Sequence, residues 1–282
     1  MKKIIIIEYF TSKSSVISKD NKIFGEAIKL TNSLIKAFSM NKTISKVYVL
    51  RNSNIKFLEN TKTTFLSVNK NTSLLKVLQK MPKYPVLFIA PETRNISANF
   101  QKKLSNYCNI LNSSINANIL LSSKLKTMKF LELNKINNTG LLSTINSDCK
   151  VVVKKNFSAG SEDVKLLKNF RNTKKRIVQK FFTGIKGSFL MICYKKMNYV
   201  ISCNKQIIHL RKNSIIQSGV IVGGLENERK KIEKLADSIT QSIDGLFGVI
   251  GVDIVKFNNE WHVIEINPRF TSAFNGVLEC FG

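Results

Sequence analysis

The segment from Gly251 to Arg269 constrains the fold more than any other part of this sequence. Two β-branched runs flank Asn258-Asn259, a pattern that predicts a β-hairpin with a tight polar turn. Three side chains with ligand oxygens interrupt the runs: Asp253, Glu265 and Asn267. A strand that faces a core seldom carries an unpaired carboxylate, because burying a bare charge is costly. The hairpin therefore predicts a polar site on one face of a sheet.

Glu265 and Asn267 are two residues apart, so in a strand both side chains leave the same face. Mg²⁺ is an obvious partner for such a pair, because it binds carboxylate and amide oxygens and shares them with phosphates. The alternative is a solvated face on which these side chains bind nothing. The spacing alone leaves both interpretations open.

The formal net charge of +27 suggests a polyanionic partner such as nucleic acid, a membrane surface or an acidic substrate. The basic residues are spread over nearly every segment instead of clustering among aromatics, which favours compositional drift over a nucleic-acid partner. The five cysteines form no Cys-x-x-Cys pair, which argues against a zinc site and a disulfide framework. No apolar run is long enough for a signal peptide or a membrane span, so a cytoplasmic protein is expected.

The first 120 residues alternate between strand-like and helix-like patterns. Strands are predicted at residues 2–10, 46–50, 64–68, 84–90 and 117–121, and helices at 24–40, 73–80 and 100–110. Such an alternation predicts a small, parallel, doubly wound α/β domain.

The remaining sequence predicts a second domain that begins with a helix at residues 124–133. Strands are predicted at residues 150–154, 176–182, 187–194, 199–203 and 206–210, and helices at 164–169 and 227–243. The hairpin follows, and residues 270–281 close the chain.

Two further stretches suit nucleotide chemistry. Lys154 ends a predicted strand before the small-residue loop Ser158–Ser161, whose backbone N–H groups could face phosphate oxygens. The strand end Gln179–Phe182 could offer main-chain groups to a planar base, although the pattern by itself favours a plain core strand followed by a turn at Gly184. Because no serine or cysteine has a convincing histidine base, the sequence does not predict a catalytic triad.

Taken in their order along the chain, these features resemble the ATP-grasp ligases. The matching residues are Lys129, Lys154 with its loop, Gln179-x-Phe181, and the hairpin ending in Glu265-Ile-Asn-Pro-Arg269. The resemblance covers most of the chain and implies an α/β and α+β architecture. It implies an N-terminal doubly wound α/β domain at residues 1–121 and an ATP-grasp domain at 122–282. The latter would divide into a small lid subdomain at about 122–183 and a larger C-terminal subdomain at about 184–282.

Shorter motifs look like the tyramine–glutamate ligase group of methanofuran-type cofactor synthesis. They are Ile7-Glu-Tyr-Phe10, Phe24-Gly-Glu-Ala27, Ala90-Pro-Glu92, Ser202-Cys-Asn-Lys-Gln206 and Asn267-Pro-Arg-Phe-Thr-Ser272. The resemblance implies an ATP-dependent carboxylate–amine ligase that works through an acyl-phosphate, with glutamate and tyramine as substrates. A homo-oligomer is compatible with this reading. The alternative function is a basic nucleic-acid-binding protein on a decayed ATP-grasp scaffold.

The resemblance also implies roles for individual residues. ATP would be bound by Lys129 and Lys154, by the loop residues Ser158, Gly160 and Ser161, and by Gln179, Lys180 and Phe181 around the adenine. Mg²⁺, or Mn²⁺ in its place, would be bound by Asp253, Glu265 and Asn267, and Arg269 would be catalytic. Three departures from the family pattern are Met128, Lys155 and Lys180, which weaken the adenine and ribose assignments more than the metal assignment.

A shared metal site makes a demand on the register of the hairpin. With a two-residue turn and a regular ladder, Asp253 pairs with Ile264 and points to the face opposite Glu265. One ion could not then contact Asp253, Glu265 and Asn267 together. We therefore predict a register shifted by one residue, through a longer loop or a β-bulge, so that Asp253 pairs with Glu265.

Overall fold

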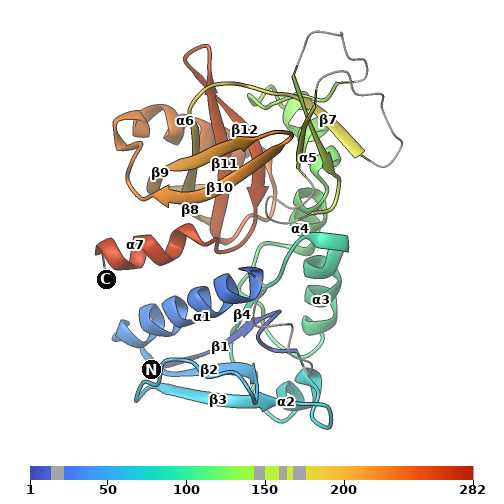
Figure 1. Ribbon diagram of the computed structural model, residues 1–282. Helices are drawn as coiled ribbons and strands as arrows, with labels where there is room; N and C mark the ends of the chain where they lie inside the picture. The colour runs from blue at the N-terminus through green and yellow to red at the C-terminus, as the bar shows by residue number, and fades with distance from the viewer. Residues whose placement is uncertain (14–21, 143–149, 159–163, 168–175, 282) are drawn as a thin grey trace. The chain divides into compact units, whose positions relative to one another are not determined.

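The computed structural model describes residues 1–13, 22–142, 150–158, 164–167 and 176–281 (Figure 1). The chain divides into two compact units. Unit 1 comprises Met1–Pro91, Ile96–Asn112 and Phe274–Gly282, and unit 2 comprises Glu92–Asn95 and Ser113–Ala273. Each unit is built on its own β-sheet.

Unit 1 is a four-stranded parallel sheet with the strand order β3-β2-β1-β4. Its strands are β1 (Lys2–Glu8), β2 (Ile44–Asn52), β3 (Thr63–Val68) and β4 (Val86–Ile89), and its helices include α1 (Lys22–Met40), α2 (Leu74–Gln79) and α3 (Ile96–Leu104). Ile5 and Ile7 on β1 contact residues of α2 and α3, and Ile4 and Ile6 on the other face are also buried. Both faces of the central strand are covered, which confirms the predicted parallel α/β arrangement.

Unit 2 is an eight-stranded antiparallel sheet with the order β12-β11-β8-β9-β10-β6-β5-β7. Its strands are β5 (Val151–Lys155), β6 (Lys165–Leu167), β7 (Arg176–Lys180), β8 (Lys186–Tyr194), β9 (Met197–Arg211), β10 (Ser214–Ile221), β11 (Gly248–Phe257) and β12 (Glu260–Asn267). Its helical segments are η1 (Thr93–Asn95), α4 (Ile115–Ser122), α5 (Lys124–Leu133), η2 (Glu226–Glu228) and α6 (Arg229–Ser242). The last helix, α7 (Ala273–Phe281), belongs to unit 1 from Phe274 onward. None of the helices in the described ranges is both long and apolar enough to cross a membrane.

The hydrophobic core of unit 2 lies against one face of this sheet. Phe189 on β8, Val252 on β11 and Val263 on β12 are all buried there, together with Ile232 and Ile239 from α6. Side chains that alternate with these along each strand point to the opposite face. That opposite face carries the polar residues of the candidate site.

The predicted strand at residues 117–121 is wrong, because these residues belong to helix α4. The side chain of Ser114 accepts a hydrogen bond from the backbone N–H of Ala117 at 3.2 Å and caps the first turn. Ala117 and Leu121 then lie on one helical face in the core. A short apolar run does not distinguish a buried strand from a buried helix, and the capping serine decides it here.

The predicted helix at residues 164–169 is also wrong where it is described, because β6 occupies Lys165–Leu167. Leu166 pairs with Val152 of β5, and its N–H donates to Asn213 O at 2.8 Å. These partners are distant in sequence and override local helix propensity. The two short strands expected at residues 199–210 are one strand, β9, and the helix expected at 100–110 ends at Leu104.

Candidate functional site

The hairpin has the predicted shifted register. Asn258 and Asn259 have φ values of 48° and 63°, the backbone of a tight turn that suits asparagine, and Phe257 pairs with Glu260. The ladder is regular down to the pair Ile254–Val263 and then shifts by one residue, so that Asp253 pairs with Glu265. A β-bulge therefore brings the two carboxylates to one face, and the prediction is confirmed.

Asn267 lies on the same face two pairs further along the hairpin. It pairs with Gly251, and residues two apart on a strand share a face. A Cβ at Gly251 would lie 2.4 Å from Cγ2 of Thr271, so only glycine allows this close approach. The hairpin thus presents two carboxylates and one amide from neighbouring positions.

The polar row continues across the next two strands. Asp253 pairs with Ser188 of β8, and Ser188 pairs with Asn204 of β9. Gln206 of β9 donates its side-chain N–H to Oδ1 of Asp253 at 2.7 Å. This bond fixes the Asp253 carboxylate on the polar face of the sheet.

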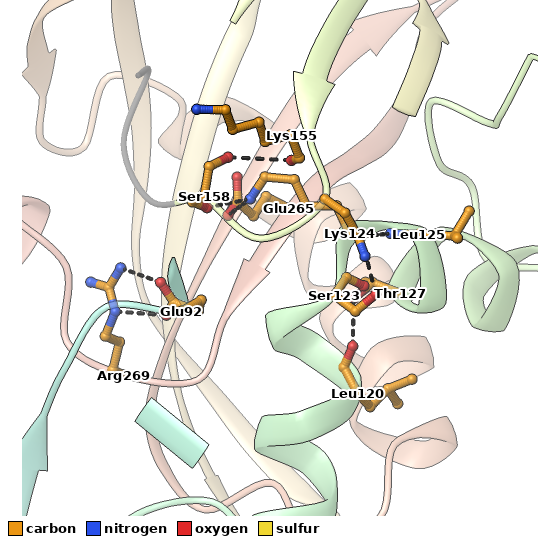
Figure 2. Close-up of polar contacts among 11 residues, drawn as sticks. Glu92, Leu120, Ser123, Lys124, Leu125, Thr127, Lys155, Ser158, Glu265 and Arg269 are labelled. Atoms are coloured by element: carbon orange, nitrogen blue, oxygen red, sulfur yellow. Dashed lines mark hydrogen bonds and ion pairs between the residues drawn. The ribbon is translucent and has the colours of Figure 1, made fainter. Parts of the chain in front are cut away.

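Lys124 connects helix α5 with the carboxylates of the hairpin. The residue is 4% exposed, and its Nζ donates to Ser158 O at 2.8 Å and forms an ion pair with Glu265 (Figure 2). The start of the helix is fixed by Asn156, whose Oδ1 accepts from the N–H of Leu125 at 2.8 Å. Lys124 therefore points from an anchored helix terminus into the site.

Lys154 adds a second buried ammonium group. It lies on β5 with 4% of its surface exposed, and burial lowers its pKa to about 8, although Glu265 attracts the charged form. Burial, reinforced by repulsion from Glu265, raises the pKa of Asp253 to about 7. Burial also opposes ionisation of Glu265, but Lys124 and Lys154 outweigh it and bring the pKa of Glu265 below its ordinary value. The two carboxylates thus differ in pKa, and Glu265 is the one that the site favours in its ionised form.

Arg269 is held by a carboxylate that precedes η1. Its Nε and Nη2 donate to the two oxygens of Glu92 at 2.7 and 2.9 Å, a bidentate pair visible in Figure 2. The Glu92 side chain is only 3% exposed. Burial alone would lower the pKa of Arg269, but the charge and hydrogen bonds of Glu92 leave it raised. This pair fixes the direction of the guanidinium group.

The strand end predicted to contact adenine has its own anchors. Gln179 is buried and donates its side-chain N–H to Oγ1 of Thr139 at 2.6 Å. Lys180 is exposed, and the N–H of Phe181 donates to Lys150 O at 3.1 Å. Hydrogen bonds from the residues on both sides of Lys180 thus hold the predicted base-binding segment in place.

The connection from β7 to β8 packs closely on the hairpin. A Cβ at Gly184 would lie 1.5 Å from Lys256 O, and the N–H of Lys256 donates to Ile185 O at 2.9 Å. The ring of Phe182 stacks on Phe257, with 4.4 Å between centroids. Lys186, the first residue of β8, donates to Phe182 O, and burial lowers its pKa to about 8.

The structure brings together Lys154, Ser158, Asp253, Glu265 and Asn267 from the predicted set. Lys129 is exposed on α5, and Gly160 and Ser161 lie outside the described residues. Sequence reasoning missed the roles of Lys124, Gln206 and Glu92 in this cluster. The N-cap residue Ser123 marks the helix start, and it is the one local signal that Lys124 begins a helix at the site.

The donor set fits a divalent cation that also binds phosphate oxygens. No group of three or more His, Cys, Asp or Glu side chains suited to a metal occurs in the described part of the chain. Two carboxylates and the amide of Asn267 leave several ligand positions for other oxygens. Mg²⁺ commonly binds in this way, through one or two carboxylates together with nucleotide phosphates.

Comparison with known proteins identifies the family. Residues 121–273, more than half of the chain, match the family model of the ATP-grasp domain. The chain belongs to the ATP-grasp family. This membership confirms the predicted ATP-grasp fold and the predicted enzyme class, an ADP-forming ligase that makes C–N bonds, and it implies ATP binding.

Relatives of this ATP-grasp protein include two archaeal ligases. It is 29% identical over 266 residues to the tyramine–L-glutamate ligase of Methanocaldococcus fervens, covering 92% of this chain and 84% of that protein. It is 28% identical over 267 residues to the enzyme of the same name from Methanocaldococcus jannaschii, covering 92% and 80%. A solved ATP-grasp superfamily structure from Archaeoglobus fulgidus superimposes with a TM-score of 0.78 at 23% identity, covering 96% of this chain and 82% of that one. This structural likeness supports the fold.

Proposed function

We propose that this ATP-grasp protein is a carboxylate–amine ligase that activates its acid substrate as an acyl-phosphate. The observation that carries the proposal is the bulged pairing of Asp253 with Glu265 beside two buried lysines. Buried ionisable groups with shifted pKa values, gathered on one face of a sheet, are typical of a catalytic site. Stability alone does not explain such a cluster, because burying these groups opposes folding.

In this proposal each group binds or orients part of the nucleotide. Lys129, Lys154 and Ser158, with the loop residues Gly160 and Ser161, contact the phosphates, and Gln179, Lys180 and Phe181 contact the base. Asp253, Glu265 and Asn267 hold Mg²⁺ or Mn²⁺. A bound divalent cation neutralises charge on the phosphate oxygens. Arg269, aligned by Glu92, stabilises the negative charge of the acyl-phosphate and of the tetrahedral species.

The proposed reaction has two steps. A carboxylate oxygen of the acid attacks the γ-phosphorus of ATP, the bond to the β-bridging oxygen breaks, and ADP leaves. The amine nitrogen then attacks the acyl carbon, and phosphate leaves with the electrons of the C–O bond. The amine loses a proton, and an amide remains. The protein supplies positive charge and orientation, and neither step needs a protein nucleophile.

Glutamate and tyramine are the proposed substrates, because the two archaeal relatives bear the name tyramine–L-glutamate ligase. Incubation with ATP, Mg²⁺, glutamate and tyramine should yield ADP, phosphate and γ-glutamyltyramine, which mass spectrometry would detect. If ADP forms only with another acid and amine, the ligase class stands and the substrates are wrong. Salt-sensitive binding to a random DNA duplex, with no nucleotide turnover on any substrate pair, would instead support the nucleic-acid-binding alternative.

A further inference from the structure

The ammonium group of Lys124 forms an ion pair with the proposed metal ligand Glu265 (Figure 2). We propose that Lys124 is a place-holder, a residue that takes the position of the divalent cation beside Glu265 until ATP binds. Its ammonium group neutralises Glu265 and keeps a cation without nucleotide from binding. When the cation arrives with ATP, Lys124 releases Glu265. This inference rests on the proposed function, because it takes Glu265 to be a metal ligand. It assigns Lys124 a positioning role that the predicted site lacks.

The geometry around Lys124 suits a side chain that changes partners. Its backbone is fixed, since its N–H donates to Asn156 O at 3.2 Å and Asn156 also binds Leu125. Its side chain is a flexible four-carbon stem, and its Nζ bonds to both Ser158 O and Glu265. The ammonium can leave Glu265 while the helix terminus stays in place. Ser158 lies at the start of the predicted phosphate-binding loop, so the second contact keeps the ammonium close to the incoming phosphates.

The charge balance of the cluster explains why the metal would arrive with ATP. Lys124 and Lys154 formally cancel Asp253 and Glu265, so a bare divalent cation meets no net negative charge. It must also displace Lys124 from Glu265. ATP brings several negative charges of its own, which attract both lysines and offset the charge of the metal. Removing the Lys124 charge should therefore favour bare cation binding.

A purely structural ion pair makes different predictions. Loss of one partner of a buried pair destabilises the fold, because the other charge remains buried and unpaired. The unpaired Glu265 would still attract a cation, so tighter binding to the variant is expected in either case. A pair that stays formed does not compete with the cation, so it gives no reason for wild-type protein to bind bare cations weakly. Binding of the cation to wild-type protein without nucleotide therefore separates the two explanations.

The test is a titration with Mn²⁺, followed by electron paramagnetic resonance, with and without ATP. Wild-type protein should bind bare Mn²⁺ weakly and Mn²⁺ with ATP at least about a hundredfold more tightly. The Lys124→Gln variant should bind bare Mn²⁺ at least about tenfold more tightly than wild type, since one cation at the site is gone. Lys124→Arg, which keeps the charge, should behave as wild type. Lys126→Gln removes an exposed lysine from the same helix and should leave both affinities unchanged.

Two outcomes would overturn the place-holder role. One is equal affinity of wild type and Lys124→Gln for bare Mn²⁺, measured on variants that circular dichroism shows to be folded. The other needs no variant: tight binding of bare Mn²⁺ to the wild-type protein. If wild type binds Mn²⁺ with ATP and Glu265→Gln does not, the proposed site survives either result. If neither protein binds Mn²⁺ with ATP, the proposed function itself fails.

Discussion

Replacing Asp253 with asparagine should stabilise the nucleotide-free protein increasingly as the pH rises. Burial and Glu265 raise the pKa of Asp253 from its ordinary value of 3.8 to about 7 in the folded state. Between these two values the folded protein holds a proton that the unfolded chain has lost. The free energy of unfolding of wild type therefore falls as the pH rises from about 4 to about 7. Asparagine does not ionise, and it can still accept the hydrogen bond from Gln206.

The magnitude follows from the size of the shift. A displacement of about 3 pKa units corresponds to about 4 kcal/mol over the full titration, since each unit is worth about 1.4 kcal/mol. Over the accessible range from pH 5 to pH 8, the stability of Asp253→Asn relative to wild type should rise by about 2–3 kcal/mol. This difference is the free energy of unfolding that the wild-type protein loses because an ionised carboxylate is buried beside Glu265.

The assay is urea denaturation of both proteins at pH 5, 6, 7 and 8, with a chelator and without nucleotide. The control is Asp237→Asn, which removes an exposed carboxylate from α6 and so measures any general effect of losing one negative charge. A constant difference in the free energy of unfolding between Asp253→Asn and wild type at all four pH values would contradict a raised pKa for Asp253. So would a difference that shrinks as the pH rises.

Three further substitutions test other parts of the account. Gly184→Ala should lower the free energy of unfolding by at least about 2 kcal/mol in urea denaturation, because the new methyl group overlaps the carbonyl of Lys256; wild-type stability would contradict the observed close approach. Glu92→Gln should lower kcat at least about tenfold and change the affinity for ATP little, because it weakens the bidentate hold on Arg269; a loss confined to KM for ATP would argue against this role. Lys154→Met should weaken ATP binding in calorimetry at least about tenfold, since it removes a buried ammonium group from the proposed phosphate site; unchanged ATP affinity would remove Lys154 from the site.

The sequence predicted those parts of the fold in which local pattern and tertiary environment agree. The alternating hairpin at Gly251–Arg269 has a clear strand period, and its two carboxylates give a reason for the bulge that the structure shows. The helix predicted at residues 124–133 coincides with α5, because a capping serine precedes it. The segments at 117–121 and 165–167 were mispredicted, since a few apolar residues carry no decisive period and the capping Ser114 lies before the apolar run.

The site was predictable only where the residue type itself signals chemistry. Asp253, Glu265 and Asn267 stood out because they are polar residues in apolar strands. Lys124 did not stand out, because a lysine in a short helix is usually solvated, and its burial depends on Asn156 and on a strand about 140 residues away. Long-range partners of this kind cannot be read from one sequence.

Isotope transfer from the acid substrate to phosphate tests whether the acid is activated as an acyl-phosphate. The acid carboxylate is labelled with ¹⁸O, starting with glutamate and using whichever acid supports turnover, and the released phosphate is analysed by ³¹P NMR. An acyl-phosphate route predicts ADP as the nucleotide product and one ¹⁸O atom in each phosphate, because the carboxylate oxygen leaves with phosphorus. Phosphate without ¹⁸O, or AMP with pyrophosphate in place of ADP, would contradict the proposed activation of the acid.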